Sequence, residues 1–420
     1  MSVPTIESRG NIYVLRWEKE KLSVTVSHLS THSDRTTCEL LFQTTDPTYN
    51  PHLFHQHFNL LAGSRSKGEL SNELARVYPT LEKIESDTII EQLCFKVLQQ
   101  YRTGEPAVEL WNTVTTKDTT YKIFPLIAED EANLIFGDGG SGKSYIVLAF
   151  AILIQLDYSD NPLCLPVKEG RVLWLDWETS QQNMERRIKL ITAGFGLPPL
   201  FIKYRYCKAR LADDIEAIQK ICLEDNINTL VIDSVGMSCG GDINNAEIAN
   251  QFFTAFRSLN STGIFIHHSS KADMQKRKKK PSPIGSIYFY NYPRNIWECR
   301  GIQEPGSDQL TIGLFHRKTN IDKYHHPLAF TLTFLDKEID IVPDDPKNIP
   351  DFVAEISVTS QIMDALRKEK TKMSIELLAE RLDQKPESIR RSLYRLQHRE
   401  KVIKIGSDWG IKSEREANVT

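Results

Sequence analysis

Residues 137–144 read GDGGSGKS, which is a complete G-x-x-x-x-G-K-[ST] pattern. The apolar residues 133–136 precede it and a stretch with Ile146, Val147 and Phe150 follows, so the sequence predicts a strand, a glycine loop and a helix. In such a loop, backbone N–H groups and the helix N-terminus surround phosphate oxygens. The alternative is an ordinary glycine-rich turn. The residues expected to bind a nucleotide are Gly137, Asp138, Gly139, Gly140, Ser141, Gly142, Lys143, Ser144 and Tyr145.

Lys143, Ser144 and one carboxylate are the residues expected to contact the phosphates and their Mg²⁺ ion. Lys143 is expected to reach the β- and γ-phosphates of ATP, and the Ser144 hydroxyl is expected to bind Mg²⁺. Residues 229–232 (TLVI) form an apolar run that ends in Asp233. Many strands end in Asp as a turn or cap residue, but the glycine loop upstream favours Asp233 as the second metal ligand.

A carboxylate pair follows another apolar run. Residues 172–175 (VLWL) lead into Asp176 and Glu178, and side chains two apart in an extended chain point to one side. ATP hydrolysis needs a carboxylate that orients the attacking water, and Glu178 is the better placed of the two. The alternative is a helix N-cap cluster ahead of residues 181–191.

Two histidines end a fourth apolar run, residues 264–267 (IFIH). Strand alternation places His267 and His268 on opposite faces, so only one of them can face the nucleotide. We expect His268 to read the γ-phosphate by hydrogen bonding and His267 to be a core residue.

The four apolar runs alternate with helical stretches between residues 122 and 343. Largely apolar runs of this kind are typical of a parallel sheet that is buried on both faces. The sequence therefore predicts a doubly wound α/β domain for this region.

The order of the motifs GDGGSGKS, WLDWETS, LVIDS and FIHHSSK resembles the RecA-like P-loop ATPases of the plasmid RepA type, which are hexameric replicative helicases. The resemblance covers about residues 122–335. It implies Glu178 as the catalytic glutamate, His268 as a sensor, and Lys143, Ser144 and Asp233 around the Mg²⁺-bound phosphates. It also implies a homo-oligomeric ring whose nucleotide sites are completed by a basic residue of the neighbouring subunit, for which Arg317 and Lys318 are the candidates.

A basic run follows the fourth apolar run directly. If six subunits formed a ring, this segment would face the central channel and contact the phosphates of DNA. A solvated charge run or a localisation signal is the alternative. The expected DNA-binding residues of the run are Lys271, Lys276, Arg277, Lys278, Lys279 and Lys280.

The C-terminal region resembles a winged helix-turn-helix. Residues 359–368, 374–382 and 387–398 have helical patterns, and 402–405 and 409–412 predict two short strands. The third helix carries Arg390, Arg391 and Arg395 between apolar residues, which indicates contact with duplex DNA. A protein-interaction module is the alternative.

Composition limits the remaining choices. Of 420 residues, 52 are Lys or Arg and 55 are Asp or Glu, so a globally basic nucleic-acid coat protein is excluded. The seven cysteines lie far apart, without a Cys-x-x-Cys pair, which favours reduced thiols over a disulfide scaffold or zinc ribbon. The longest apolar run is too short to span a bilayer, so we expect a cytoplasmic protein that does not engage a membrane.

The expected organisation has four parts: a small α+β domain of unknown role at 1–115, a RecA-like ATPase domain at 116–343, a linker at 344–350, and a winged helix at 351–420. The expected function is an ATPase that acts as a ring-forming DNA helicase in the replication of a mobile element. The alternatives are an initiator or helicase loader that does not translocate, and a nucleotide-gated DNA-binding regulator.

Overall fold

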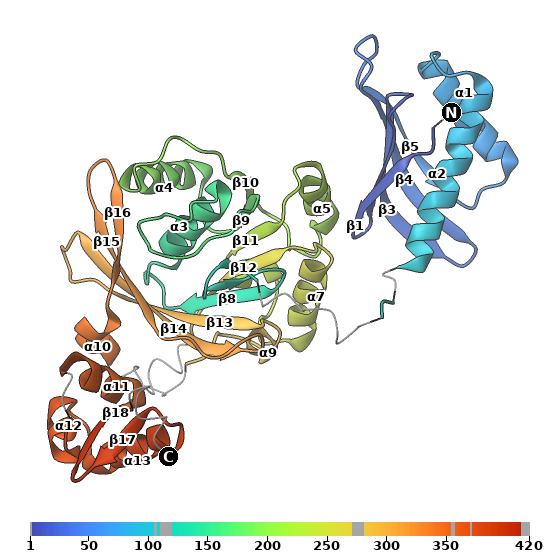
Figure 1. The fold of residues 1–420 in the computed structure, drawn as a ribbon. Coiled ribbons are helices and arrows are strands. Elements are labelled where there is room, and N and C mark those ends of the chain that lie inside the picture. Colours follow the sequence, from blue (N-terminus) through green and yellow to red (C-terminus); the bar gives the residue numbers. More distant parts are fainter. Residues whose placement is uncertain are drawn as a thin grey trace.

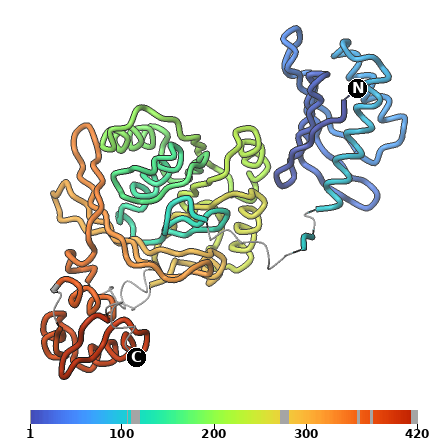
Figure 2. The backbone as a smooth tube through the Cα atoms, viewed as in Figure 1, coloured from blue at the N-terminus to red at the C-terminus, as the bar shows by residue number. Residues whose placement is uncertain are grey.

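The computed structural model describes residues 2–104, 107–109, 120–270, 281–353, 358–369 and 372–412. An N-terminal module, a large central domain and a C-terminal module follow one another along the chain (Figures 1 and 2). The basic run 271–280, and with it Lys271, Lys276, Arg277, Lys278, Lys279 and Lys280, lies outside the described residues.

Within the described residues, the central domain is built on a sheet of nine strands in the order β10-β9-β11-β12-β8-β13-β14-β15-β16. The strands from β10 to β13 in that order are parallel, and β14, β15 and β16 extend the sheet in antiparallel fashion. The bounds are β8 (Ala132–Gly137), β9 (Val172–Asp176), β10 (Lys203–Tyr206), β11 (Thr229–Asp233), β12 (Thr262–His268), β13 (Asn295–Ile302), β14 (Gln309–Thr319), β15 (Leu328–Phe334) and β16 (Ile339–Asp344).

Helices cover both faces of this sheet. The bounds are α3 (Lys143–Leu156), α4 (Gln181–Gly194), α5 (Ile215–Glu224), α6 (Val235–Cys239), α7 (Ala246–Arg257) and α9 (Tyr288–Asn291). Trp174 of β9 packs into the core under α3 and α4, whereas Leu173 and Leu175 pack into the core under α5 and α7. The prediction of a mixed α/β domain with a parallel sheet is therefore confirmed, and the antiparallel extension was not predicted. A two-stranded sheet of β6 (Tyr121–Ile123) and β7 (Ile127–Ala128) precedes β8.

The N-terminal module is an antiparallel sheet covered by two helices. Its elements are β1 (Thr5–Arg9), β2 (Ile12–Trp17), β3 (Leu22–His32), β4 (Arg35–Thr44), β5 (His52–Asn59), α1 (Ser64–Val77) and α2 (Lys83–Thr103). Residues 52–59 pair with β4, so the helices of this module begin only at Ser64.

The N-terminal module docks on the central domain through the turn that joins β1 to β2. The Arg9 guanidinium donates to the backbone carbonyl oxygens of Ile227 (2.6 Å) and Asn260 (3.0 Å). Next to it, a Cβ on Gly10 would lie 1.8 Å from the Gln219 amide nitrogen, so the turn fits closely against α5. The module is thus held by specific contacts in addition to its covalent link.

The C-terminal module contains α11 (Val358–Glu369), α12 (Ile375–Arg381), α13 (Pro386–His398), β17 (Val402–Ile405) and β18 (Asp408–Ile411). The linker expected at 344–350 is ordered: β16 includes Asp344, and η1 (Pro346–Asn348) and α10 (Pro350–Val353) follow. The reason is that Phe352 is buried against Phe315 and Ala329 of the central sheet, and this packing fixes the position of residues 344–353.

No helix among the described residues is long and apolar enough to cross a membrane. All seven cysteines are free thiols, and only Cys164 is exposed.

Candidate nucleotide-binding site

The glycine loop lies between β8, a central strand of the sheet, and α3. Gly142 adopts φ +83°, a conformation that L side chains rarely take, and a Cβ there would lie 2.5 Å from the Ile312 side chain. Gly137 faces the backbone of β13 so closely that a Cβ would lie 2.1 Å from the Cys299 carbonyl oxygen. Both glycines are required for the loop to turn tightly over the end of the sheet. Gly139 and Gly140 border open space, which is the room that a phosphate group needs.

Lys143 is the first residue of α3, and its ammonium group is turned back into the loop. It donates to the carbonyl oxygens of Gly137 (3.0 Å) and Asp138 (2.6 Å). Burial lowers the pKa of Lys143, although the nearby Cys299 and Asp233 act in the opposite direction. It also donates to the Ser141 hydroxyl oxygen (3.4 Å), so all its hydrogen-bond partners are neutral oxygens, and such a buried cation is well suited to pair with an anionic ligand in the same cleft.

Asp233 ends β11 beside the start of α3. Its carboxylate is buried and accepts a hydrogen bond from Ser144, and burial raises its pKa to about 6. An aspartate and a hydroxyl oxygen fit Mg²⁺, which commonly takes one or two protein oxygens and completes its shell with water and substrate phosphates. Among the described residues, no three His, Cys, Asp or Glu side chains form a site that would hold a metal by themselves.

Glu178 lies beyond the end of β9 and faces the same cleft. The Ser234 hydroxyl donates to its carboxylate, and His268 Nε2 lies 3.6 Å from Glu178 Oε1. Contact with His268, together with the Ser234 hydrogen bond, lowers the pKa of Glu178 below its ordinary value, despite partial burial. The carboxylate is therefore ionised at neutral pH and 40% exposed, as a group that binds water must be.

Asp176 has a different environment from Glu178. It is fully buried, and its Oδ1 accepts the backbone N–H groups of Glu178 and Thr179, both at 2.8 Å. Burial raises its pKa. Asp176 thus shapes the turn that presents Glu178 and has no open side toward the cleft.

The two histidines of β12 separate as their alternation predicts. His268 faces Glu178, while His267 is fully buried and its Nε2 lies 2.9 Å from the Ile284 carbonyl oxygen. Burial lowers the pKa of His267 to about 4.

Five residues of the cleft were not predicted from the sequence. They are Arg187, Ile266, Gln303, Leu310 and Phe334, which line a cavity of about 470 Å³ together with the loop, Glu178, Asp233 and His268. The Arg187 guanidinium lies 4.9 Å from the centre of the Tyr145 ring, and the Phe334 ring lies 5.3 Å from it. Phe334 belongs to a distant antiparallel strand, so no local pattern could have indicated it.

The structure places the other candidates away from this cleft. Arg317 is ion-paired with the buried Glu298. The Lys318 ammonium donates to the carbonyl oxygens of three residues, Tyr290, Asn291 and Pro293, and burial lowers its pKa to about 8. Both side chains are thus engaged within their own subunit. Arg390, Arg391 and Arg395 are exposed on α13 in the C-terminal module.

Comparison with known families supports the nucleotide site. Residues 111–274 match a family described as an AAA domain. No curated protein matches the chain. The match, the glycine loop and the parallel-rich sheet together define a P-loop ATPase domain in the middle of the chain.

Proposed function

We propose that this protein hydrolyses ATP and couples hydrolysis to DNA, as a ring-forming replicative helicase of a mobile element. The observation that carries the ATPase part is the convergence of Lys143, the Ser144–Asp233 pair and the Glu178–His268 pair in one cleft. Lys143 and Ser144 begin the helix after β8, Glu178 follows β9, and Asp233 and His268 end β11 and β12.

Each group has a definite task in the proposed reaction. The glycine loop binds the phosphates through its N–H groups, and Lys143 leaves its carbonyl partners to neutralise charge on the β- and γ-phosphates. Ser144 and Asp233 would hold Mg²⁺, which neutralises phosphate charge when bound. Glu178, ionised and fixed by Ser234, orients a water molecule in line with the γ-phosphate and accepts its proton.

The cleft also supports recognition of the base. Tyr145, Phe334 and Arg187 form an aromatic and cationic wall beside the phosphate loop. A nucleobase can stack on such a wall. His268 lies where it can hydrogen-bond the γ-phosphate and Glu178, so its partner changes once that phosphate leaves.

Contact with single-stranded DNA is supported by the position of the basic run 271–280. The residues that flank the run are tied to the nucleotide site, because the Ser269 N–H donates to the Gly137 carbonyl oxygen (3.1 Å). On the other flank, the Ile284 N–H donates to the His268 carbonyl oxygen (2.9 Å). A change at the phosphate loop or at the end of β12 can therefore reach Ser269 and Ile284, which flank the run in the sequence.

A second candidate function is a nucleotide-gated regulator, initiator or helicase loader that binds duplex DNA without translocating. The observation that favours it is the C-terminal module, in which α13 exposes Arg390, Arg391 and Arg395 while Ile389, Leu393 and Leu396 are buried. Three helices and a two-stranded sheet in this order are consistent with a winged helix.

Steady-state ATP hydrolysis by the purified full chain separates the two functions. The helicase proposal requires stimulation by single-stranded DNA, and a ring detectable by native mass measurement with an ATP analogue. Replacement of the five cations at 276–280 by Ser should remove the stimulation and leave the basal rate intact. Slow hydrolysis that DNA does not alter, together with tight binding of duplex DNA, would favour the regulator and contradict the helicase.

A further inference from the structure

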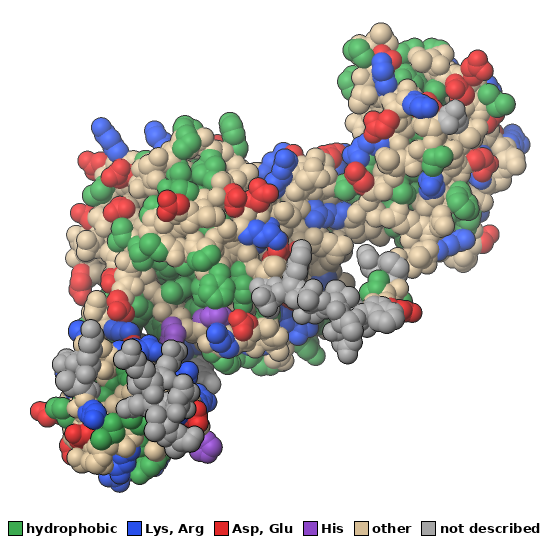
Figure 3. All heavy atoms as spheres, in the orientation of Figure 1, with side chains coloured by type: hydrophobic (Ala, Val, Ile, Leu, Met, Phe, Trp, Pro, Cys, Tyr) green, Lys and Arg blue, Asp and Glu red, His purple; other side chains and the backbone are tan. Residues whose placement is uncertain are grey.

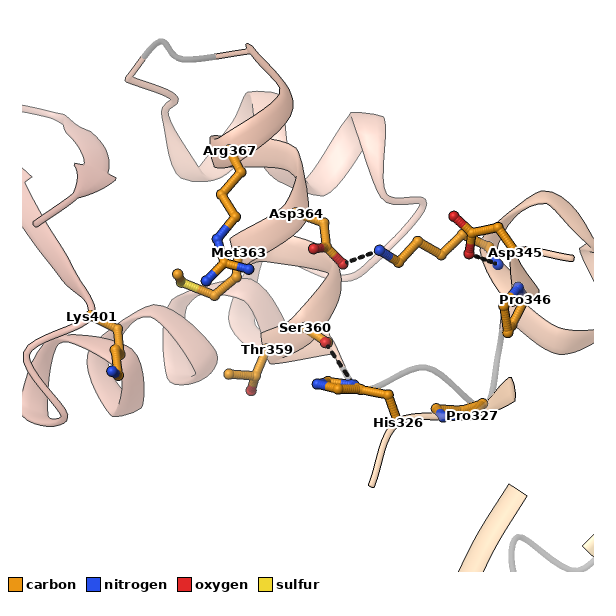
Figure 4. A pocket seen from close by; sticks show the side chains of 11 residues that line it. His326, Pro327, Asp345, Pro346, Thr359, Ser360, Met363, Asp364, Arg367 and Lys401 are labelled. Atoms are coloured by element: carbon orange, nitrogen blue, oxygen red, sulfur yellow. Dashed lines mark hydrogen bonds and ion pairs between the residues drawn. The ribbon is translucent and has the colours of Figure 1, made fainter. Parts of the chain in front are cut away.

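A cleft of about 560 Å³ lies where the C-terminal module meets the central domain, and we call it the junction cleft. One wall is formed by the segment before β15 and by η1 with the residue before it, and the other by α11 and Lys401, which precedes β17 (Figure 4). Its lining residues are His326, Pro327, Asp345, Pro346, Lys347, Thr359, Ser360, Met363, Asp364, Arg367 and Lys401.

The two ends of the junction cleft differ in charge. At the η1 end, Lys347 forms an ion pair with Asp364 (2.6 Å), and the Asp345 carboxylate accepts the backbone N–H of Lys347 (3.0 Å). The charges at this end are therefore compensated within the chain, and the ion pair bridges the two modules.

The opposite end is cationic. Arg367 and Lys401 are exposed, and neither forms an ion pair in the part of the chain that the structure describes. In Figure 4 both extend into the cleft at the end away from Asp345. Thr359 lies between them and His326, whose Nδ1 is 3.4 Å from the Ser360 hydroxyl. Space-filling atoms also show basic and His side chains gathered at this junction (Figure 3).

Helix α11 also brings two hydroxyl groups, those of Thr359 and Ser360, to the lining of the cleft. Guanidinium, ammonium and hydroxyl groups are the groups that bind phosphate in proteins.

The rest of the lining is apolar. Its apolar members are Pro327, Pro346 and Met363. A free phosphate ion would leave these surfaces exposed to water, whereas the sugars and bases of a nucleic-acid strand would cover them.

We propose that the junction cleft binds the phosphodiester backbone of a DNA strand, with Arg367 and Lys401 as the phosphate contacts. The proposal rests on the DNA-binding function given above and adds a site outside both the basic run and α13. A strand seated there touches the ATPase domain and the C-terminal module at once, so DNA binding there would strengthen the docking that the Lys347–Asp364 pair provides.

The test is the salt dependence of binding to a labelled 20-nucleotide single strand, measured by fluorescence anisotropy with the full chain. Each phosphate contact contributes about 0.7 to the slope of log affinity against log salt for single strands, so Arg367→Gln with Lys401→Gln should lower the slope by about 1.4. Lys337→Gln, which removes an exposed cation in the turn after β15, is the matched control and should leave the slope unchanged. Thermal unfolding verifies that the double variant folds.

The possible outcomes are distinguishable. An unchanged slope in the double variant, with wild-type DNA binding intact, overturns the junction-cleft proposal alone. No DNA binding by the wild type overturns the proposed function itself. A third outcome is that inorganic phosphate or ATP fully abolishes the part of DNA binding that Arg367 and Lys401 provide. That result would assign the cleft to a free phosphate compound and overturn the DNA proposal.

Discussion

Single residues of the site owe their properties to burial and to their immediate partners. Lys143 is buried with neutral oxygen partners, so its charged form carries a desolvation free energy that an anionic ligand can offset. Lys143→Ala removes that cation and should weaken ATP binding by at least tenfold and abolish hydrolysis. Equilibrium binding of a fluorescent ATP analogue measures this directly. Lys189→Ala, an exposed position on α4, is the control and should bind like the wild type.

His267 gives a pH dependence of stability that can be separated from catalysis. Its Nδ1 is buried and has no hydrogen-bond partner among the residues that the structure describes, and its pKa in the folded protein is about 4, below the ordinary 6.5. The unfolded chain therefore binds the proton more tightly, so stability is lost as the pH falls from about 6.5 toward 4. The loss attributable to this group is on the order of 3 kcal/mol.

His267→Gln keeps a donor for the Ile284 carbonyl oxygen and cannot titrate. We expect the difference in unfolding midpoint between pH 7 and pH 4.5 to be smaller in this variant than in the wild type, as measured by thermal unfolding. An equal difference in both proteins would show that His267 is not protonated during acid unfolding. His32→Gln, an exposed histidine of β3, serves as the control.

At the scale of elements, Arg9 is one of the residues that dock the N-terminal module on the central domain. Arg9 of β1 donates to carbonyl oxygens of the central domain, and each hydrogen bond from a charged group contributes roughly 1.5–3 kcal/mol. Arg9→Ala should increase hydrogen–deuterium exchange in β1 and in the segment around Asn260. Arg16→Ala removes an arginine that pairs with Glu7 inside the N-terminal module and should leave exchange at Asn260 unchanged. Identical exchange in wild type and Arg9→Ala would contradict the docking role.

The sequence predicts helices and strands correctly where a strand is buried on both faces or where buried residues recur at a regular spacing. The runs that became β8, β9, β11 and β12 are apolar throughout because helices cover both faces of the sheet. β5 was missed because its exposed histidines and glutamine hide the alternation, and β16 because its end at Asp344 reads as a turn-rich linker. Only the pairing with β4 and β15 makes them strands.

The site residues that could be predicted are those that follow the apolar runs of the parallel sheet. Lys143, Ser144, Asp233, Glu178 and His268 stand in short motifs at strand ends, so the parallel sheet brings them together without further information. Arg187 and Phe334 enter the cleft from a helix face and from an antiparallel strand. Their place depends on the packing of α4 and on the β14–β16 extension, which no motif describes.

At the scale of the whole molecule, the phosphate-handling residues and the C-terminal module are separable. Deletion of residues 354–420 keeps Phe352, which is buried against the central sheet, and removes α11, α12, α13 and the two-stranded sheet. Basal ATP hydrolysis should be unchanged, while affinity for duplex DNA should fall by at least tenfold. Duplex affinity equal to that of the full chain would assign the module to protein interaction.

ATP turnover by Glu178→Gln tests the central claim most directly, because this change removes the water-activating carboxylate and keeps the side-chain volume. We expect the variant to bind the ATP analogue with near wild-type affinity and to hydrolyse ATP at least a hundredfold more slowly in steady state. Glu185→Gln on the exposed side of α4 is the matched control and should turn over like the wild type. Turnover of Glu178→Gln within a few-fold of the wild type would contradict the assignment of this cleft as an ATPase site built around Glu178.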